Sequence, residues 1–332
     1  MVEKERCNSF KGTSFIRSRM IGAEGVARRY GRGGAVVALH GVTFRLDKGD
    51  VLGVLGGDGS GKTTLIRILA TLLQPTAGRA TVGDFDVAYD GDRIRDIIGY
   101  LPQTPSLQGN PTLAQYLDFW ATVAGMPKAK RRGRVTELIS FFDLTGQAME
   151  RVLDATTFAQ RRLFLALVLL SNPPFLLLDE PMAGLTLAER DALIPKLRAL
   201  QDQGKTILMT ATKLADLQPV CSHILTLFDG RSTRSYPTPV LLRKVGDAHH
   251  ARVFVESKAP VSDVRTALRD VHGLIDVKET EGALVLFVEP GVFRADELRA
   301  ALASAEVEVK NVREAALTIG DIFRTLSSEE AA

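Results

Sequence analysis

The sequence lacks a long hydrophobic run. No apolar stretch reaches the ~20 residues that a membrane-spanning helix needs, and the longest candidate, residues 163–178, is broken by two polar residues and two prolines. It is predicted to divide into a buried helix end and a buried strand. The first residues are charged and polar, unlike the apolar core of a secretory leader. We therefore expect a cytoplasmic protein, peripheral on the inner face of the cell membrane only through a partner.

Cysteine and net charge are also scarce. The two cysteines, Cys7 and Cys221, are isolated and show no C-x-x-C or metal-ligand spacing, which excludes a disulfide framework and suggests a reducing compartment. A net charge of only +3 does not favour nucleic acid as the partner. A chain of 332 residues has room for one large and one smaller domain, each with its own core.

One glycine-rich run stands out. Residues 56–63 read GGDGSGKT and match the phosphate-loop pattern G-x-x-x-x-G-K-[ST]. An apolar strand is predicted before the run, at 51–55, and a helix with apolar residues at helical spacing after it. Glycines let successive N–H groups converge on phosphate oxygens, and the helix dipole favours their charge. Lys62 would reach the β- and γ-phosphates, and the Thr63 hydroxyl would hold Mg²⁺. The predicted phosphate-binding residues are Gly56, Gly57, Asp58, Gly59, Ser60, Gly61, Lys62, Thr63 and Thr64.

A second run carries two carboxylates. Residues 175–178 are continuously apolar, which is typical of a central strand in a parallel sheet, and Asp179 and Glu180 follow directly. Beside a phosphate loop, Asp179 would join the Mg²⁺ shell and Glu180 would polarise the attacking water.

Two further residues are candidates by position. Gln103 ends a short predicted strand over 98–103 that Pro102 closes. Tyr30 is predicted in a loop beside Gly31, where it is either incidental or stacks on a purine ring.

The rest of the chain sets the predicted domain boundaries. Residues 1–19 are expected to be a disordered extension or a mis-called start, with Met20 opening the first domain, 20–235. A helical subdomain is expected at about 105–170. Its basic cluster over 128–134 is interpreted as a solvated loop or as a contact for anionic lipid headgroups.

The C-terminal part follows a new pattern. Residues 236–250 are expected to form a linker, and 251–332 a domain whose strands and helices alternate as βαββαβ plus a last helix over 319–326. This order resembles a ferredoxin-like module.

Together these residues resemble the nucleotide-binding subunit of an ATP-binding cassette (ABC) transporter, from Met20 to about Gly230. The resemblance implies an α/β fold: a P-loop NTPase core with a helical subdomain, joined here to a small C-terminal α+β domain. It implies ATP and Mg²⁺ as cofactors, a separate transmembrane permease and a second ABC ATPase domain as partners. Residues 317–323 resemble the tail of drug-exporter ATPases, which implies export.

The resemblance also implies roles for single residues. Tyr30 matches the adenine-stacking aromatic residue, and Gln103 matches the glutamine that senses Mg²⁺ and contacts the membrane subunit. Thr63, Gln103 and Asp179 would hold Mg²⁺. Glu180, Lys62 and Gln103 would be the catalytic residues.

Three family elements are altered. The Leu-Ser-Gly-Gly-Gln signature, which donates to the γ-phosphate of the opposite subunit, is replaced by Ala155, Thr156, Thr157, Phe158 and Ala159. The switch histidine after the strand that begins at Thr206 is Thr212, which cannot take up charge. The aspartate expected after Leu185 is Thr186.

These losses predict slow or partner-dependent hydrolysis. A homodimer would have two sites short of γ-phosphate donors, whereas a heterodimer partner would supply an intact signature, so a heterodimer is favoured. The alternatives are a regulatory pseudo-ATPase of a membrane complex and a soluble ABC-type ATPase acting on ribosomes or DNA. A P-loop kinase fits the phosphate loop but not Gln103 and the carboxylate pair.

Overall fold

The computed structural model divides into two compact units, Met1–Thr238 and Pro239–Ala332, and each is described by itself. The expectation for residues 1–19 lies outside the described residues, as does most of the helix expected over 319–326. The structure describes residues 20–31, 35–247, 251–257, 260–269, 271, 273–280, 283–288, 295–304, 309–315, 322–323 and 326–327.

A mostly parallel sheet forms the centre of the first unit. Its strand order is β10-β9-β3-β8-β7-β6, and β11 pairs with β9. Every residue of β3, β7 and β8 is buried, because elements cover both faces of a parallel sheet. The strands are β3 (Val51–Gly56), β6 (Ile98–Leu101), β7 (Phe175–Leu178), β8 (Thr206–Ala211), β9 (His223–Phe228), β10 (Arg231–Ser232) and β11 (Tyr236–Pro237).

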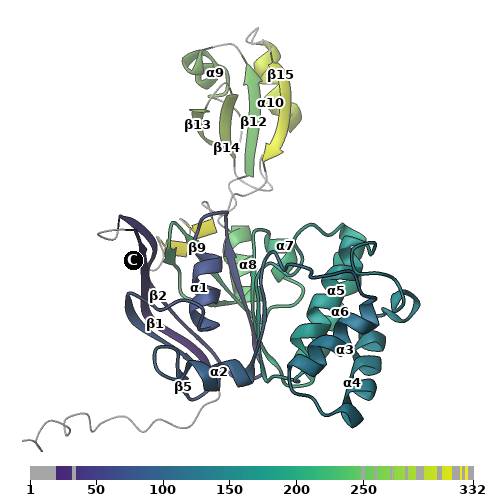
Figure 1. Cartoon of the computed structure of the whole chain (residues 1–332). Coiled ribbons are helices and arrows are strands. Elements are labelled where there is room, and N and C mark those ends of the chain that lie inside the picture. The colour runs from purple at the N-terminus through teal and green to yellow at the C-terminus, as the bar shows by residue number, and fades with distance from the viewer. Residues whose placement is uncertain are drawn as a thin grey trace, which may run out of the picture. The chain divides into compact units, whose positions relative to one another are not determined.

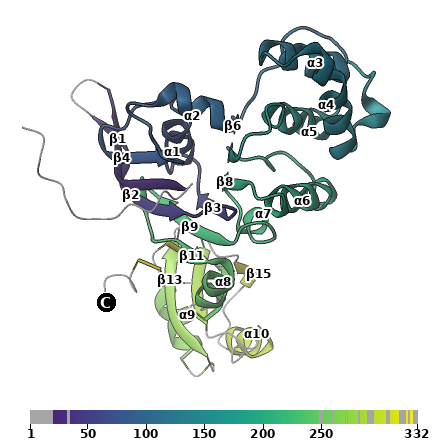
Figure 2. The same ribbon diagram turned by 90° about the horizontal axis from the view of Figure 1, so that it is seen from below.

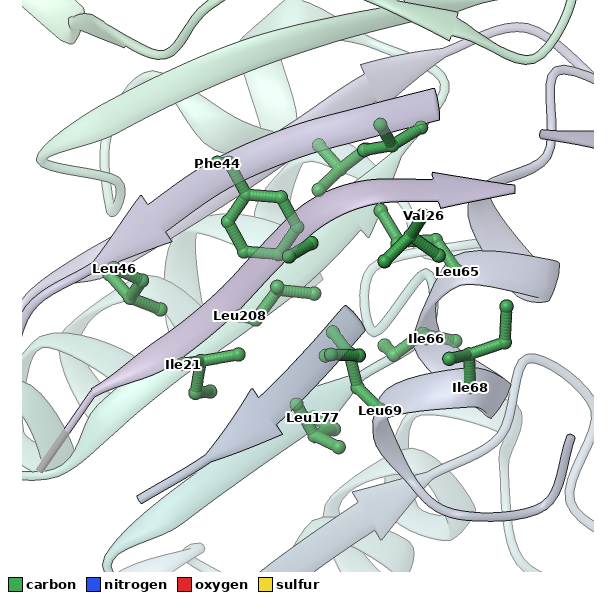
Figure 3. Packing of buried hydrophobic residues seen from close by; sticks show 14 of the residues in the cluster. Ile21, Val26, Phe44, Leu46, Leu65, Ile66, Ile68, Leu69, Leu177 and Leu208 are labelled. Atoms are coloured by element: carbon green, nitrogen blue, oxygen red, sulfur yellow. The ribbon is translucent and has the colours of Figure 1, made fainter. Parts of the chain in front are cut away.

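An antiparallel sheet packs beside it. The order is β2-β1-β4-β5, made of β1 (Ile21–Tyr30), β2 (Val36–Leu46), β4 (Ala77–Val82) and β5 (Phe85–Asp86). Its inner residues, the helix α1 (Lys62–Leu69) and the parallel sheet share one hydrophobic core. Figure 3 shows side chains from all three parts of this core, among them Ile21, Val26, Phe44, Leu46, Leu65, Ile66, Ile68, Leu69, Leu177 and Leu208.

The other helices of the first unit gather mainly on the far side of the parallel sheet, where α3, α4, α5 and α6 lie together (Figures 1 and 2). A one-turn 3-10 helix spans Thr145–Gln147. The α-helices are α2 (Gly91–Ile97), α3 (Leu113–Val123), α4 (Lys128–Phe141), α5 (Thr157–Val168), α6 (Leu187–Asp202) and α7 (Leu214–Leu217).

The loop interpretation of the basic cluster is wrong, because residues 128–134 form the first half of α4. Lysine and arginine are good helix formers, and this helix buries Val135, Leu138 and Ile139 against the unit. The C-cap residue Phe142 is also buried, so these four apolar residues form the face of α4 that packs.

The segment expected as a linker, residues 236–250, contains regular secondary structure instead. Tyr236 in β11 pairs with Ile224 of β9 and is 4% exposed, and the Thr238 hydroxyl donates to the Cys221 carbonyl over 2.6 Å. A helix, α8 (Thr238–Asp247), follows at once. Pairing with a central strand therefore continues the first unit through 236–238.

The second unit has the βαββαβ order expected for it. Its antiparallel sheet runs β13-β14-β12-β15, and its core includes Val264, Leu268 and Leu298. The first helix of this unit, α9, ends at Ala267. The elements are β12 (Ala251–Ser257), α9 (Val261–Ala267), β13 (Leu274–Thr280), β14 (Ala283–Val288), α10 (Ala295–Ser304) and β15 (Val309–Ala315).

Candidate nucleotide-binding site

The predicted phosphate loop connects β3 to α1. Gly61 precedes the helix with φ 105°, a left-handed conformation that favours glycine, and no side chain caps α1. A Cβ on Gly61 would lie 2.6 Å from the Ala38 carbonyl oxygen, and one on Gly56 would lie 2.3 Å from Ser60 Oγ. The glycines therefore allow a tight turn that leads into a helix N-terminus with no side-chain cap.

Lys62 folds back over this turn. Its ammonium group donates to the carbonyl oxygens of Gly56 and Gly57, over 2.7 and 2.8 Å. It also forms an ion pair with Glu180 Oε1 at 3.2 Å, and only 4% of its side chain is exposed. A buried cation with several acceptors is strongly oriented, and here it lies over the turn.

The two carboxylates are set at the end of β7 by one hydroxyl. Thr210 of β8 donates to Asp179 Oδ1 over 2.7 Å and accepts from the Glu180 N–H over 3.0 Å. Asp179 is fully buried, and its Oδ2 makes no hydrogen bond within the described part of the chain. Glu180 has φ 48°, which is strained for a residue with a side chain. A buried carboxylate oxygen without a donor is suited to a cation.

The strand register places the other candidates at the same edge. Leu101 lies opposite Leu178, Leu178 opposite Met209, and Leu55 opposite Ala211. The residues that follow these strands therefore share the carboxyl edge of the sheet, where ligands of open α/β sheets bind. They are the phosphate loop, Gln103, Asp179, Glu180 and Thr212. Gln103 lies two residues past β6 rather than at its end, and its side chain is exposed.

The predicted loop position of Tyr30 is wrong. Tyr30 is the last residue of β1, where it pairs with Val36 of β2. The ring is half-buried, and its hydroxyl lies 3.4 Å from Thr64 Oγ1 on α1. The Arg28 guanidinium lies over the ring, 4.8 Å from the centroid. Strand pairing thus positions Tyr30 beside the helix that begins at the phosphate loop.

The segment aligned with the family signature begins α5. Thr156 is the N-cap, and its hydroxyl accepts from the Ala159 N–H over 3.2 Å. The Phe158 ring is covered by the Arg162 guanidinium, 4.3 Å from the centroid. Ala155 and Ala159 are buried, while Thr156 and Thr157 are exposed. The Thr156 hydroxyl therefore caps its own helix as an acceptor.

Thr186 has a similar role at the start of α6. It forms a capping box with Glu189, in which the Thr186 N–H and hydroxyl donate to the carboxylate over 2.8 and 2.9 Å. These hydrogen bonds lower the pKa of the Glu189 carboxyl. The residue that stands at the aspartate position thus stabilises a helix end.

Three polar residues at this edge were missed by the sequence reasoning. Thr210 is a buried hydroxyl that follows three apolar residues in β8, which was a usable signal. Asp216 on α7 is buried and forms an ion pair with Arg190 of α6 at 3.0 Å. Burial raises the pKa of the Asp216 carboxyl, and the charge of Arg190 opposes that rise. Asp216 lines a small hollow together with Glu180 and Thr212.

Arg161 of α5 is also buried beside this edge. Its Nη2 donates weakly to the Ala183 carbonyl over 3.4 Å, and burial lowers the pKa of its guanidinium, opposed by the charge of Glu180. An arginine on an otherwise apolar helix face carried no pattern that would have identified it from the sequence.

The site fits a Mg²⁺-bound triphosphate better than a metal held by protein alone. Among the described residues, no group of three or more His, Cys, Asp or Glu side chains is arranged to hold a metal ion. Mg²⁺ is usually bound by one or two protein oxygens together with phosphate oxygens and water. The free Asp179 Oδ2 beside an uncapped helix start matches that pattern.

Comparison with known proteins supports the same reading. The sequence profile of the ABC transporter family matches residues 39–183. A daunorubicin resistance ATP-binding protein, DrrA2 of Streptomyces coeruleorubidus, is 31% identical over 306 residues, covering 92% of this chain and 94% of the relative. The chain belongs to the ABC transporter family of ATP-binding subunits.

Other relatives and solved structures agree with this assignment. A Nod factor export ATP-binding protein of Rhizobium etli is 32% identical, over 62% of this chain and 65% of the relative. A solved structure of an ABC transporter ATP-binding subunit has a TM-score of 0.60 at 24% identity, covering 68% of this chain and 93% of that one. A dimeric cassette bound to ADP and Pi has a TM-score of 0.59 at 23% identity, covering 66% and 98%. Both likenesses show the α/β cassette fold.

The length and hydropathy of the described helices bear on a possible membrane span. None of them is long and apolar enough to cross a bilayer.

Proposed function

We propose that this chain binds Mg·ATP at the β3–α1 turn as the ATP-binding subunit of an ABC exporter, coupled to a separate permease, with slow or partner-dependent hydrolysis. The observation that carries the proposal is the uncapped start of α1 lying at the same sheet edge as the free Asp179 Oδ2. Export is supported by the names of the relatives, a drug-resistance and a Nod factor export protein.

The residues of this chain would then act as follows. Lys62 would exchange its carbonyl and Glu180 partners for phosphate oxygens. Thr63, Asp179 and Gln103 would hold Mg²⁺, which neutralises charge on the phosphates when bound. Released from Lys62, Glu180 would accept a proton from the attacking water. Tyr30 would stack on adenine.

The reason to expect slow hydrolysis lies in the altered elements. Thr157 and Phe158 occupy positions where glycines would let the backbone approach phosphate. Thr212 cannot supply a charge. Each missing preorganised donor costs about 2–4 kcal/mol of transition-state stabilisation. A heterodimer with an intact cassette would restore the donors missing at this chain's pocket.

Binding and turnover are tested separately. Calorimetric titration of the purified chain with Mg·ATP should give saturable binding that Lys62→Ala weakens by more than about tenfold. Steady-state turnover of the chain alone should be near background and should rise when a cassette with an intact signature is added. Unchanged binding by Lys62→Ala would overturn the site, and family-level turnover by the isolated chain would overturn the impairment.

Restoring glycines in the signature segment gives a sharper test of the impaired hydrolysis. Changing Thr157 and Phe158 to glycine should raise turnover of the isolated chain by about 30-fold or more if missing donors limit it. The matched control is the same double change with Glu180→Gln, in which turnover should stay at background.

A second candidate is a regulatory pseudo-ATPase, which the start of α5 favours because Thr157 and Phe158 stand where glycines would let the backbone approach a second nucleotide. It predicts nucleotide-dependent assembly that survives Glu180→Gln, and no gain of turnover from a partner or from signature repair.

A further inference from the structure

The hairpin formed by α3 and α4, residues 113–141, holds an unusual concentration of positive charge. It contains five basic residues and two acidic ones, which gives a net charge equal to the +3 of the whole chain. The charges of all the other residues therefore sum to zero. The basic residues are Lys128, Lys130, Arg131, Arg132 and Arg134, and the acidic ones are Asp118 and Glu137.

The charge lies at one end of α4 and faces solvent. The side chains of Lys128, Lys130 and Arg132 are exposed and form no hydrogen bond or ion pair within the part of the chain that the structure describes. No acidic residue lies in the first turn, and the N-cap Pro127 supplies no side-chain acceptor. The positive end of the helix dipole therefore adds to the side-chain charges instead of being offset. Repulsion between these charges and the helix dipole destabilises α4. An anionic surface placed against this end would stabilise it.

Exposed apolar side chains lie beside these cations. Phe119 and Val123, one turn apart on α3, are 57% and 59% exposed. The Arg131 guanidinium donates to the Thr122 hydroxyl, so the basic end of α4 is tied to the end of α3 that carries them. In both views α3 and α4 lie on the side of the first unit away from β1 and β2 (Figures 1 and 2).

Aromatic rings pack behind this surface. The Phe119 and Trp120 ring centroids are 5.6 Å apart, and the buried Tyr116 lies 6.3 Å from Trp120. Trp120 is half-buried, and its indole Nε1 is buried without a hydrogen bond within the described residues. Tryptophan is enriched at the membrane–water interface, where lysine and arginine also reach headgroups.

We propose that the hairpin surface made of Phe119, Val123, Lys128, Lys130 and Arg132 binds the anionic headgroup region of a lipid bilayer. Cations alone would fit any acidic partner, but a solvent-facing phenylalanine and valine beside them favour a surface with both phosphate and acyl chains. Binding here needs no nucleotide, so this inference and the proposed ATP site stand or fall separately.

Trp120 is the only tryptophan of the chain and makes the test direct. The full-length protein is titrated with vesicles of phosphatidylcholine containing phosphatidylglycerol, and with pure phosphatidylcholine vesicles. We expect co-sedimentation and a blue shift of the Trp120 emission with the anionic vesicles alone. Both should weaken strongly in about 1 M NaCl, where the Debye length falls to about 3 Å.

Two variants of equal net charge locate the effect. Reversing Lys128, Lys130 and Arg132 to glutamate should lower the vesicle partition coefficient at least about 100-fold, because each basic residue near an anionic surface contributes a several-fold gain. Reversing three exposed basic residues elsewhere, at Lys48, Arg231 and Arg243, changes the net charge by the same amount and should leave most of the binding.

Several outcomes would overturn the proposal. They are equal binding losses in the two triple variants, vesicle binding without a Trp120 shift, and binding of soluble polyglutamate without binding of anionic vesicles, which would indicate an acidic protein partner. Phe119→Ser keeps the charge and, being on an exposed site, the fold. It should reduce the blue shift several-fold, and an unchanged shift would also contradict the proposal.

Discussion

The starts of α1 and α5 differ in one respect that decides what each can bind. At α1 no side chain caps the helix, and the residue before it is a glycine held in a left-handed conformation. At α5 the Thr156 hydroxyl accepts from the third N–H of the helix, and Phe158 carries a ring covered by Arg162. Both ends expose helix donors in principle. Only the first leaves all of them without a side-chain acceptor.

The comparison shows that a helix N-terminus can bind an anion when no side chain of the protein accepts hydrogen bonds from its first N–H groups. Capping stabilises a helix by about 1 kcal/mol, so leaving α1 uncapped has a cost. The buried ion pair of Lys62 with Glu180 at 3.2 Å offsets part of it in the absence of ligand. By contrast, α5 and α6 begin with threonine caps, which stabilise the helix rather than leave its N–H groups for a ligand.

The largest expected effect comes from placing a methyl group at the start of α1. Gly61→Ala would put a Cβ 2.6 Å from the Ala38 carbonyl oxygen at a positive φ, so we expect a loss of about 2–4 kcal/mol of unfolding free energy and more than tenfold weaker Mg·ATP binding. Gly146→Ala is the matched control, because this glycine lies in the 3-10 helix outside the site and no atom lies within 4 Å of its Cβ. Urea unfolding and calorimetry measure both. Equal effects of the two changes would show that the turn is not the cradle.

The next effect concerns the hydroxyl that holds the carboxylates. Thr210→Val removes the donor to Asp179 Oδ1 and the acceptor of the Glu180 N–H, both buried. We expect a loss of about 1–3 kcal/mol of unfolding free energy, because buried polar groups are left without partners. Thr210→Ser keeps the hydroxyl and should recover most of it. A valine variant as stable as the parent in urea would contradict this role.

The smallest effect tests the capped helices. Thr156→Ala and Thr186→Ala should each lower the unfolding free energy by about 1 kcal/mol and leave the Mg·ATP affinity of the isolated chain unchanged. Reduced affinity in either variant would mean that the segment serves this chain's own pocket.

The Thr186 effect should depend on pH. Folding lowers the pKa of Glu189 through its hydrogen bonds from Thr186. The stabilisation is therefore present above the unfolded pKa of about 4.3 and is lost as the pH falls through the lower folded value. The difference in melting temperature between parent and Thr186→Ala should narrow at acid pH, where the bonds to the carboxylate are lost and the bond from the Glu189 N–H to Thr186 remains. A constant difference would contradict the role of the Glu189 carboxylate in the capping box.

Several of these features could be predicted from the sequence because local pattern fixes them. The strand–turn–helix at residues 51–69 and the apolar strand before Asp179 formed where the pattern indicated. The cap at Thr186 carried a readable signal, since threonine is followed three residues later by Glu189. The basic cluster was misinterpreted because charge was taken as a sign of a loop, although lysine and arginine favour helices.

What the sequence determined by itself is the cradle: glycines at 56, 59 and 61 with Lys62 and Thr63 fix a backbone turn whose conformation depends on nearest neighbours along the chain. What only the tertiary structure decided is which polar groups remain available around it. Thr210 reaches Asp179 from a different strand, and Arg190 reaches Asp216 from a different helix. Such partners are set by strand order and packing across 26 residues or more of chain, and no local pattern records them.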